Sequence, residues 1–140
     1  MMKERKIFQL VTSSDICLTY ELLHRRGLVS FPVTSDGRNK IGAIVESINS
    51  EYFGRAIYHS LEEKTVAYLY FLIKDHPFVD GNKRTASLVF ESICALNGLK
   101  PNYGDFSLDS LAVFVEKIKE EDHQNTIKKI AEVLFRKEGR

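Results

Sequence analysis

The sequence has no tryptophan, three prolines, two cysteines and almost no excess charge of either sign. Cys17 and Cys94 form no CxxC motif and lie inside helical apolar patterns, so we expect buried, reduced thiols rather than a disulfide or a zinc site. The longest apolar run, Val66–Ile73, falls far short of the roughly 20 residues that a membrane span needs. A net charge of +1 gives no general attraction for nucleic acids or membranes. Free thiols and the lack of a signal peptide favour a cytoplasmic location.

A hydrophobic content of 44% is typical of a chain that buries a core, and 140 residues are the length of one domain, residues 1–140. Most of the chain has helical periodicity. Apolar residues recur at that spacing in residues 16–23, 41–48, 61–74, 86–97, 111–118 and 127–134. The pattern predicts an all-α fold, a compact helical bundle with a short β-like flap, about residues 50–58, before the central helix.

Several element ends can be predicted from residue type. Residues 13–15 are capping candidates for the first helix, and the stretch 30–40 is predicted as a loop because it is rich in Ser, Asp, Gly and Pro. Gly98 suits the left-handed position after a helix, and Ser107 should cap the helix that follows. The last helix should have a basic, frayed end.

The segment "DHPFVDGNKRTA", residues 75–86, concentrates polar chemistry between two long apolar patterns. Pro77 disfavours a helical His76, so the preceding helix should stop near Asp75. Asp80 occupies the expected N-cap of the next helix, and residues 81–83 form its first turn. That turn presents unpaired N–H groups and the positive end of the helix dipole, which together favour an anion.

Four side chains give this turn its predicted chemistry. Lys83 and Arg84 supply two cations for phosphate, and Asp80 is the type of ligand that Mg²⁺ takes together with phosphate oxygens. His76 is the nearby candidate for a general base. The residues therefore predict a site for phosphoryl or nucleotidyl transfer. The alternative on residue type alone is an ordinary polar helix start in contact with solvent.

The segment closely resembles the signature of the Fic/Doc (Fido) family, His-x-Phe-x-(Asp/Glu)-(Gly/Ala)-Asn-x-Arg. The residues that match it are His76, Phe78, Asp80, Gly81, Asn82 and Arg84. A weaker likeness to death-on-curing (Doc) proteins extends from about Leu22 to Gly98.

This resemblance implies a role for each residue, with ATP as substrate and Mg²⁺ as cofactor. His76 would take a proton from a hydroxyl of a target protein, Asp80 would hold Mg²⁺, residues 81–83 would cradle phosphates and Arg84 would clamp them. The target would add as a strand to the flap. The flap residues expected to dock it are Tyr52, Phe53, Gly54, Arg55, Ala56 and Ile57.

Two positions separate the subfamilies that the resemblance allows. Family members that transfer AMP usually have Gly at the position of Lys83, and a second Arg at the position of Ser87. The chain is more similar to Doc, which implies transfer of the γ-phosphoryl group to a Ser or Thr by a toxin, with a separate antitoxin that inserts near Arg84. AMP transfer and a non-catalytic binding module remain alternatives.

Overall fold

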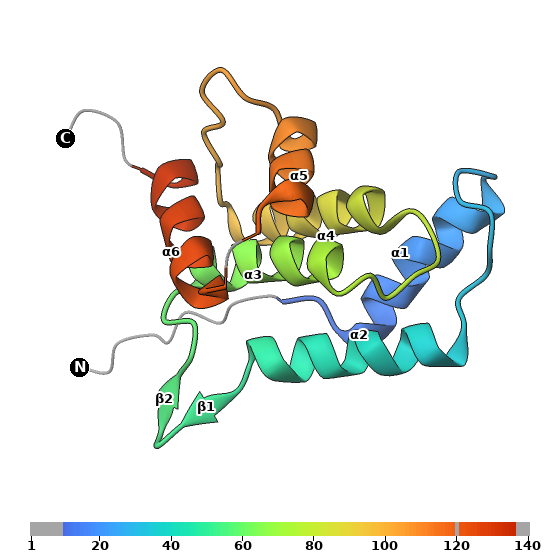
Figure 1. Cartoon of the computed structure of the whole chain (residues 1–140), viewed down its shortest axis with the longest axis horizontal. Helices are drawn as coiled ribbons and strands as arrows, with labels where there is room; N and C mark the ends of the chain where they lie inside the picture. Colours follow the sequence, from blue (N-terminus) through green and yellow to red (C-terminus); the bar gives the residue numbers. More distant parts are fainter. Residues whose placement is uncertain (1–9, 120, 137–140) are drawn as a thin grey trace.

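The computed structural model describes residues 10–119 and 121–136 (Figure 1). Their element order is α1 (Ser13–Arg25), α2 (Ser35–Ile48), β1 (Glu51–Tyr52), β2 (Arg55–Ala56), α3 (Leu61–Lys74), α4 (Asn82–Asn97), α5 (Leu108–Lys117) and α6 (His123–Leu134). The prediction of an all-α bundle with a short β element before the central helix is confirmed.

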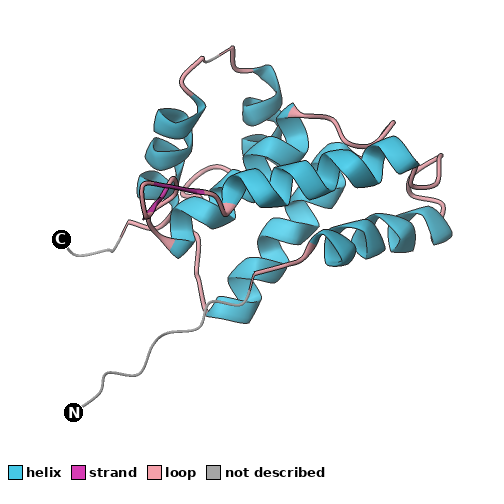
Figure 2. Ribbon diagram, turned by 90° about the horizontal axis from the view of Figure 1, so that it is seen from below, coloured by secondary structure: helices cyan, strands magenta, loops and turns pink. Residues whose placement is uncertain are grey.

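Helix α3 forms the centre of the bundle. It packs against α2, α4, α5 and α6, while α1 packs against α2 and α4 (Figures 1 and 2). Residues 66–70 of α3 are completely buried, although Tyr68 and Tyr70 are among them. A helix that is apolar on nearly every side must be covered on nearly every side, and the arrangement of its neighbours achieves this.

The predicted end of α3 is also confirmed. The helix stops at Lys74, and His76, directly before Pro77, has a φ of 46°. Positive φ is uncommon for a residue other than glycine, so the chain leaves α3 through a tight turn at this histidine. Gly98 has a φ of 67° at the end of α4, as predicted.

Two predicted helix starts are wrong. Helix α1 is capped by Thr12, whose hydroxyl accepts a hydrogen bond from Asp15 N, and Asp15 completes a reciprocal capping box. Helix α2 starts at Ser35, inside the stretch predicted as a loop, because the Thr34 hydroxyl accepts a bond from Gly37 N. Capping by threonine outweighed the turn-forming composition of this stretch.

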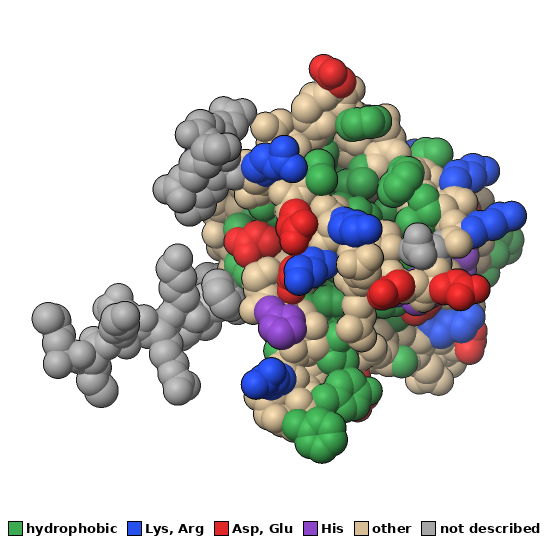
Figure 3. Space-filling view, turned by 60° about the vertical axis from the view of Figure 1, so that its left-hand side comes forward, with side chains coloured by type: hydrophobic (Ala, Val, Ile, Leu, Met, Phe, Trp, Pro, Cys, Tyr) green, Lys and Arg blue, Asp and Glu red, His purple; other side chains and the backbone are tan. Residues whose placement is uncertain are grey.

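The flap is a β-hairpin of two short antiparallel strands with two residues each, in which Glu51 pairs with Ala56 and Tyr52 with Arg55. Phe53 and Gly54 make its turn with φ values of 52° and 75°, the left-handed pair that suits a tight hairpin. Apolar side chains project at this lower end of the molecule (Figure 3), where Tyr52 is 66% exposed and Phe53 is fully exposed.

Both cysteines are buried free thiols, as predicted. Burial raises the pKa of Cys94 to about 11, which makes its thiol a poor nucleophile at neutral pH. Among the described residues, no helix has the length and apolar character needed to cross a membrane. The predicted frayed end of the last helix includes residues 137–140, which lie outside the described residues.

Candidate active site

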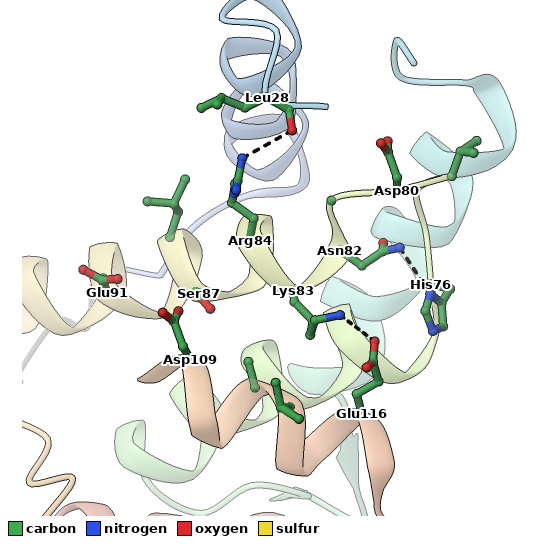
Figure 4. A pocket seen from close by; sticks show the side chains of 15 residues that line it. Leu28, His76, Asp80, Asn82, Lys83, Arg84, Ser87, Glu91, Asp109 and Glu116 are labelled. Atoms are coloured by element: carbon green, nitrogen blue, oxygen red, sulfur yellow. Dashed lines mark hydrogen bonds and ion pairs between the residues drawn. The ribbon is translucent and has the colours of Figure 1, made fainter. Parts of the chain in front are cut away.

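A cleft of about 780 Å³ opens beside the start of α4. One wall is the loop from His76 to Gly81 and the first turns of α4, and the other is α5, with Leu28 from the α1–α2 connection at the edge (Figure 4). The structure therefore brings the polar residues of the predicted motif together around one open space.

The loop before α4 is held by the side chain of Asn82. Its Oδ1 accepts a hydrogen bond from Phe78 N, and its Nδ2 donates to Phe78 O, both at 3.0 Å. Nδ2 also lies 3.2 Å from Nδ1 of His76, so the same amide helps to orient the imidazole. Tyr20 of α1 stacks on the Phe78 ring with centroids 3.9 Å apart, which fixes the loop from its other side. The buried side chain of Asn82 thus shapes the loop.

The predicted N-cap is wrong, because Gly81 rather than Asp80 precedes α4. Gly81 has a φ of 74° and offers no side-chain cap. The first N–H groups of an α-helix have no acceptor within the helix, so those of α4 remain available at the cleft. The other described helices all have a side-chain oxygen that caps them, from Thr12, Thr34, Ser60, Ser107 and Asp122.

Gly81 packs closely against the side chain of Val29 in the α1–α2 connection. A Cβ at this position would lie 2.3 Å from Cγ1 of Val29. The family resemblance implies that Gly81 helps to cradle phosphate, and this role stays a prediction. In the structure, glycine is required because the α1–α2 connection packs directly against the turn.

Asp80 is directed toward the same connection. Its Oδ2 accepts a hydrogen bond from Ser30 N at 3.1 Å, and its Oδ1 lies 3.4 Å from the Tyr20 hydroxyl. That hydroxyl donates its proton to Phe31 O at 2.7 Å, so it is not the main partner of the carboxylate. Burial and the nearby Asp80 raise the pKa of Tyr20, which keeps its hydroxyl protonated.

The Asp80 carboxylate fits a magnesium ion that brings other ligands with it. A carboxylate has about four acceptor sites; here Ser30 N donates to one of them and the Tyr20 hydroxyl lies 3.4 Å from another, which leaves the others open to a cation. Among the described residues, no group of three or more His, Cys, Asp or Glu could hold a metal. This donor set matches the preference of Mg²⁺ for one or two carboxylates plus waters and phosphate oxygens.

The two cations of the motif already have partners in the protein. Arg84 Nη1 donates to Leu28 O at 3.3 Å, and Lys83 Nζ lies 2.7 Å from Oε2 of Glu116 on α5. The hydrogen bond from Lys83 lowers the pKa of Glu116, so this carboxylate is ionised at neutral pH. Figure 4 shows the Lys83–Glu116 pair spanning the two walls.

Farther along α4 the cleft becomes acidic. Ser87 and Glu91 line it from α4, and Asp109 lines it from α5. Lys83 and Arg84 therefore lie at the end nearest His76, and two carboxylates lie at the other end. This division of charge could not be predicted from the sequence, because α5 is distant from the motif along the chain.

The hairpin residues 52–57 do not line this cleft. The hairpin precedes α3 and the motif follows it, and a helix of 14 residues separates the two by about 20 Å. Residues 28–30 contact the motif instead, through Leu28 O, the Val29 side chain and Ser30 N. Sequence reasoning missed this segment, although exposed apolar residues such as Leu28 and Phe31 in a connection between helices were an available signal.

A protein-family model matches the segment that contains the motif. The family model described as the Fic/DOC family matches residues 12–94, which is more than half of the chain and includes α1, the α1–α2 connection and the whole motif. No match was found among curated proteins or among solved structures.

Proposed function

The chain belongs to the Fic/DOC family, and we propose on that basis that it transfers the γ-phosphoryl group of ATP to a Ser or Thr hydroxyl of a target protein. Members of this family transfer nucleotide or phosphate groups to proteins. Phosphoryl transfer by a Doc-like toxin is the specific reaction proposed here.

One observation carries the proposal: the uncapped N-terminus of α4 opens into a cleft beside His76 and Asp80. Free N–H groups and the helix dipole stabilise an anion there, as they do in other phosphate sites. Lys83 and Arg84 add positive charge in the same turn. The combination supports a bound polyphosphate rather than a simple polar surface.

The residues can then divide the work of transfer. His76 would accept the proton of the target hydroxyl as its oxygen forms a bond to the γ-phosphorus, and the bond from that phosphorus to the β,γ-bridging oxygen would break to release ADP. Asp80 would hold Mg²⁺, which supplies positive charge to the phosphate oxygens when bound. The N–H groups of α4 and the side chain of Arg84 would bind the transferred group as its charge is redistributed.

The acidic end of the cleft favours phosphoryl transfer over AMP transfer. Relatives that transfer AMP usually bind the phosphate tail with a second arginine at the position of Ser87. Here Ser87 has no charge, and Glu91 and Asp109 line the same region. A polyphosphate extended along α4 would meet two carboxylates, so we place the phosphates at the turn of Lys83 and Arg84.

The biological role proposed is that of a cytoplasmic toxin with a separate antitoxin acting near Arg84. The target hydroxyl must reach His76, and Leu28 of the α1–α2 connection borders the same cleft. Docking of the target as a strand on the hairpin stays a prediction, and it requires a target that extends from the cleft to the far end of α3.

The test is transfer of label from ATP to proteins of a bacterial lysate, with γ-labelled and α-labelled ATP in parallel. We expect label from the γ-position alone. His76→Ala should lower the rate by about 10²–10⁴-fold, the usual contribution of a general base. His59→Ala is the matched control, because His59 is an exposed histidine outside the cleft and its replacement should leave transfer unchanged.

The other outcomes separate the alternatives. Label from the α-position alone means that AMP is transferred and that the γ-label leaves with pyrophosphate, which would replace the kinase by an AMP transferase. ATP binding without transfer from either position indicates a non-catalytic module. Transfer that survives His76→Ala at full rate would remove His76 from the role of base.

A further inference from the structure

The ion pair between Lys83 and Glu116 spans the cleft at the end nearest His76. Lys83 is in the first turn of α4 and Glu116 is in the last turn of α5, and their charged atoms are 2.7 Å apart. The side chains are 43% and 28% exposed, so solvent and ligands can reach the pair. The dashed contact in Figure 4 runs from one wall to the other, next to His76.

In this ion pair, the positive charge of Lys83, which would attract a polyphosphate, is already paired with the Glu116 carboxylate. A bound phosphate gains from Lys83 through Coulomb attraction, and a carboxylate at hydrogen-bond distance from Nζ cancels most of that attraction. The Glu116 carboxylate also adds a negative charge to the place where further negative charge must bind. Its ionisation at neutral pH is favoured by the hydrogen bond from Lys83, which lowers its pKa.

Attachment of α5 to the bundle does not require this pair. Ala112 and Val115 of α5 are buried in the core and hold the helix against its neighbours. An exposed ion pair usually contributes little to folding. The other ion pairs within the described ranges, Arg38–Glu21 and Lys40–Asp36, lie away from the cleft.

We propose that Glu116 is a positioning residue that sets the affinity for polyphosphate by holding Lys83 against α5 until a di- or triphosphate displaces it. In the free protein Lys83 Nζ pairs with the Glu116 carboxylate, and in the bound protein it pairs with phosphate oxygens. The inference rests on the proposed function, since it concerns the same phosphate site. It adds an acidic residue, far from the motif in sequence, that opposes donor binding.

The test measures binding of inorganic tripolyphosphate and of ATP, each with Mg²⁺, by isothermal titration calorimetry. Glu116→Gln removes the charge with little change in shape, and it should tighten both ligands by about threefold to tenfold, because a neutral amide competes weakly for Lys83. Asp109→Asn is the matched control. It removes the same charge from the same helix and cleft without touching the Lys83 pair, so its effect should be below about twofold.

A double-mutant cycle shows whether Glu116 acts through Lys83. Lys83→Met keeps the apolar stem and removes the charge. In this background, Glu116→Gln should raise the affinity for tripolyphosphate and ATP by no more than Asp109→Asn does. A structural role of Glu116 would not produce tighter binding that depends on Lys83. A similar thermal unfolding midpoint for Glu116→Gln and the parent protein excludes misfolding as the cause of any change.

Each result decides the question. Binding that is unchanged or weaker in Glu116→Gln overturns the proposal, and so does equal tightening by Asp109→Asn, which would indicate a general charge effect. Tighter tripolyphosphate binding without any transfer from ATP keeps the role of Glu116 and rejects the kinase. If the γ-phosphoryl group is transferred but Glu116→Gln does not bind the ligands more tightly, the kinase function stands and the proposed role of Glu116 is rejected. If the parent protein binds neither ligand, Glu116→Gln must create measurable binding for the proposal to stand.

Discussion

Replacing Gly81 with alanine would force a Cβ into space that Val29 occupies. The new atom would lie 2.3 Å from Cγ1 of Val29, and the φ of 74° would become a strained conformation for an L-residue. The left-handed backbone costs about 1–2 kcal/mol, and overpacking of a buried neighbour adds about 1–3 kcal/mol. We therefore expect Gly81→Ala to lower the free energy of unfolding by about 2–5 kcal/mol.

The other end of the same helix provides the control. Gly98 has a φ of 67°, and a Cβ there would meet nothing within 4 Å. Gly98→Ala should therefore show the backbone cost alone, about 1–2 kcal/mol. The difference between the two variants measures the contact between Gly81 and Val29.

Urea unfolding of four proteins completes the measurement: the two glycine variants, Val29→Ala and the double variant Gly81→Ala/Val29→Ala. If the clash is real, the double variant will be less destabilised than the sum of its single variants by about 1–3 kcal/mol. Equal destabilisation by Gly81→Ala and Gly98→Ala, or strict additivity in the double variant, would refute the reasoning. Tripolyphosphate binding should weaken in Gly81→Ala and stay unchanged in Gly98→Ala.

Two predictions concern tyrosines. Tyr20→Phe removes the hydrogen bond to Phe31 O and leaves a carbonyl of the α1–α2 connection without its donor. The free energy of unfolding should therefore fall by about 1–3 kcal/mol, and Mg²⁺-dependent phosphate binding should weaken. The control is Tyr68→Phe, which should affect stability alone, because the buried Tyr68 hydroxyl bonds Asn49 outside the cleft. Equal ligand affinity in both variants would contradict this role of Tyr20. Burial raises the pKa of Tyr58 and of Tyr103 to about 12. From about pH 10 upward the unfolded chain loses protons that the folded chain keeps, so the free energy of unfolding should fall as pH rises toward 12. Absorbance at 295 nm should show tyrosines of the folded protein that still ionise above pH 11, and complete ionisation of the folded protein below pH 11 would count against the burial of Tyr58 and Tyr103.

The helices could be predicted from the sequence because their signals are local. The apolar run in α3 predicts burial on most sides, and Pro77 restricts the residue before it whatever the rest of the chain does. The motif likewise places His76, Asp80 and Arg84 within one short segment, so their presence in one cleft follows from a loop and a first helical turn. Capping was harder to predict, since several Ser, Thr and Asp residues near α1 and α2 compete for that role.

The contacts that complete the site could not be predicted, because they join segments distant in sequence. Nothing near Lys83 in the chain indicates Glu116, which is 33 residues away on another helix. The hairpin and the α1–α2 connection are both irregular, exposed and partly aromatic, so composition does not show which of them borders the cleft. Only the packing of α1 against α4 decides between them.

That packing makes the α1–α2 connection part of the site. Leu28 accepts from the guanidinium of the motif arginine, Val29 fills the space beside the motif glycine, and Ser30 donates to the motif aspartate. Consecutive residues of one short segment therefore contact the proposed phosphate clamp Arg84, the start of α4 and Asp80, the carboxylate proposed to hold Mg²⁺. A shift in the path of this segment would move all three together, whereas a change in one motif side chain alters one of them. The family match begins at residue 12, before α1, and so includes this support as well as the motif. The site is therefore better described as a motif held by a preceding connection than as a loop that forms its geometry alone.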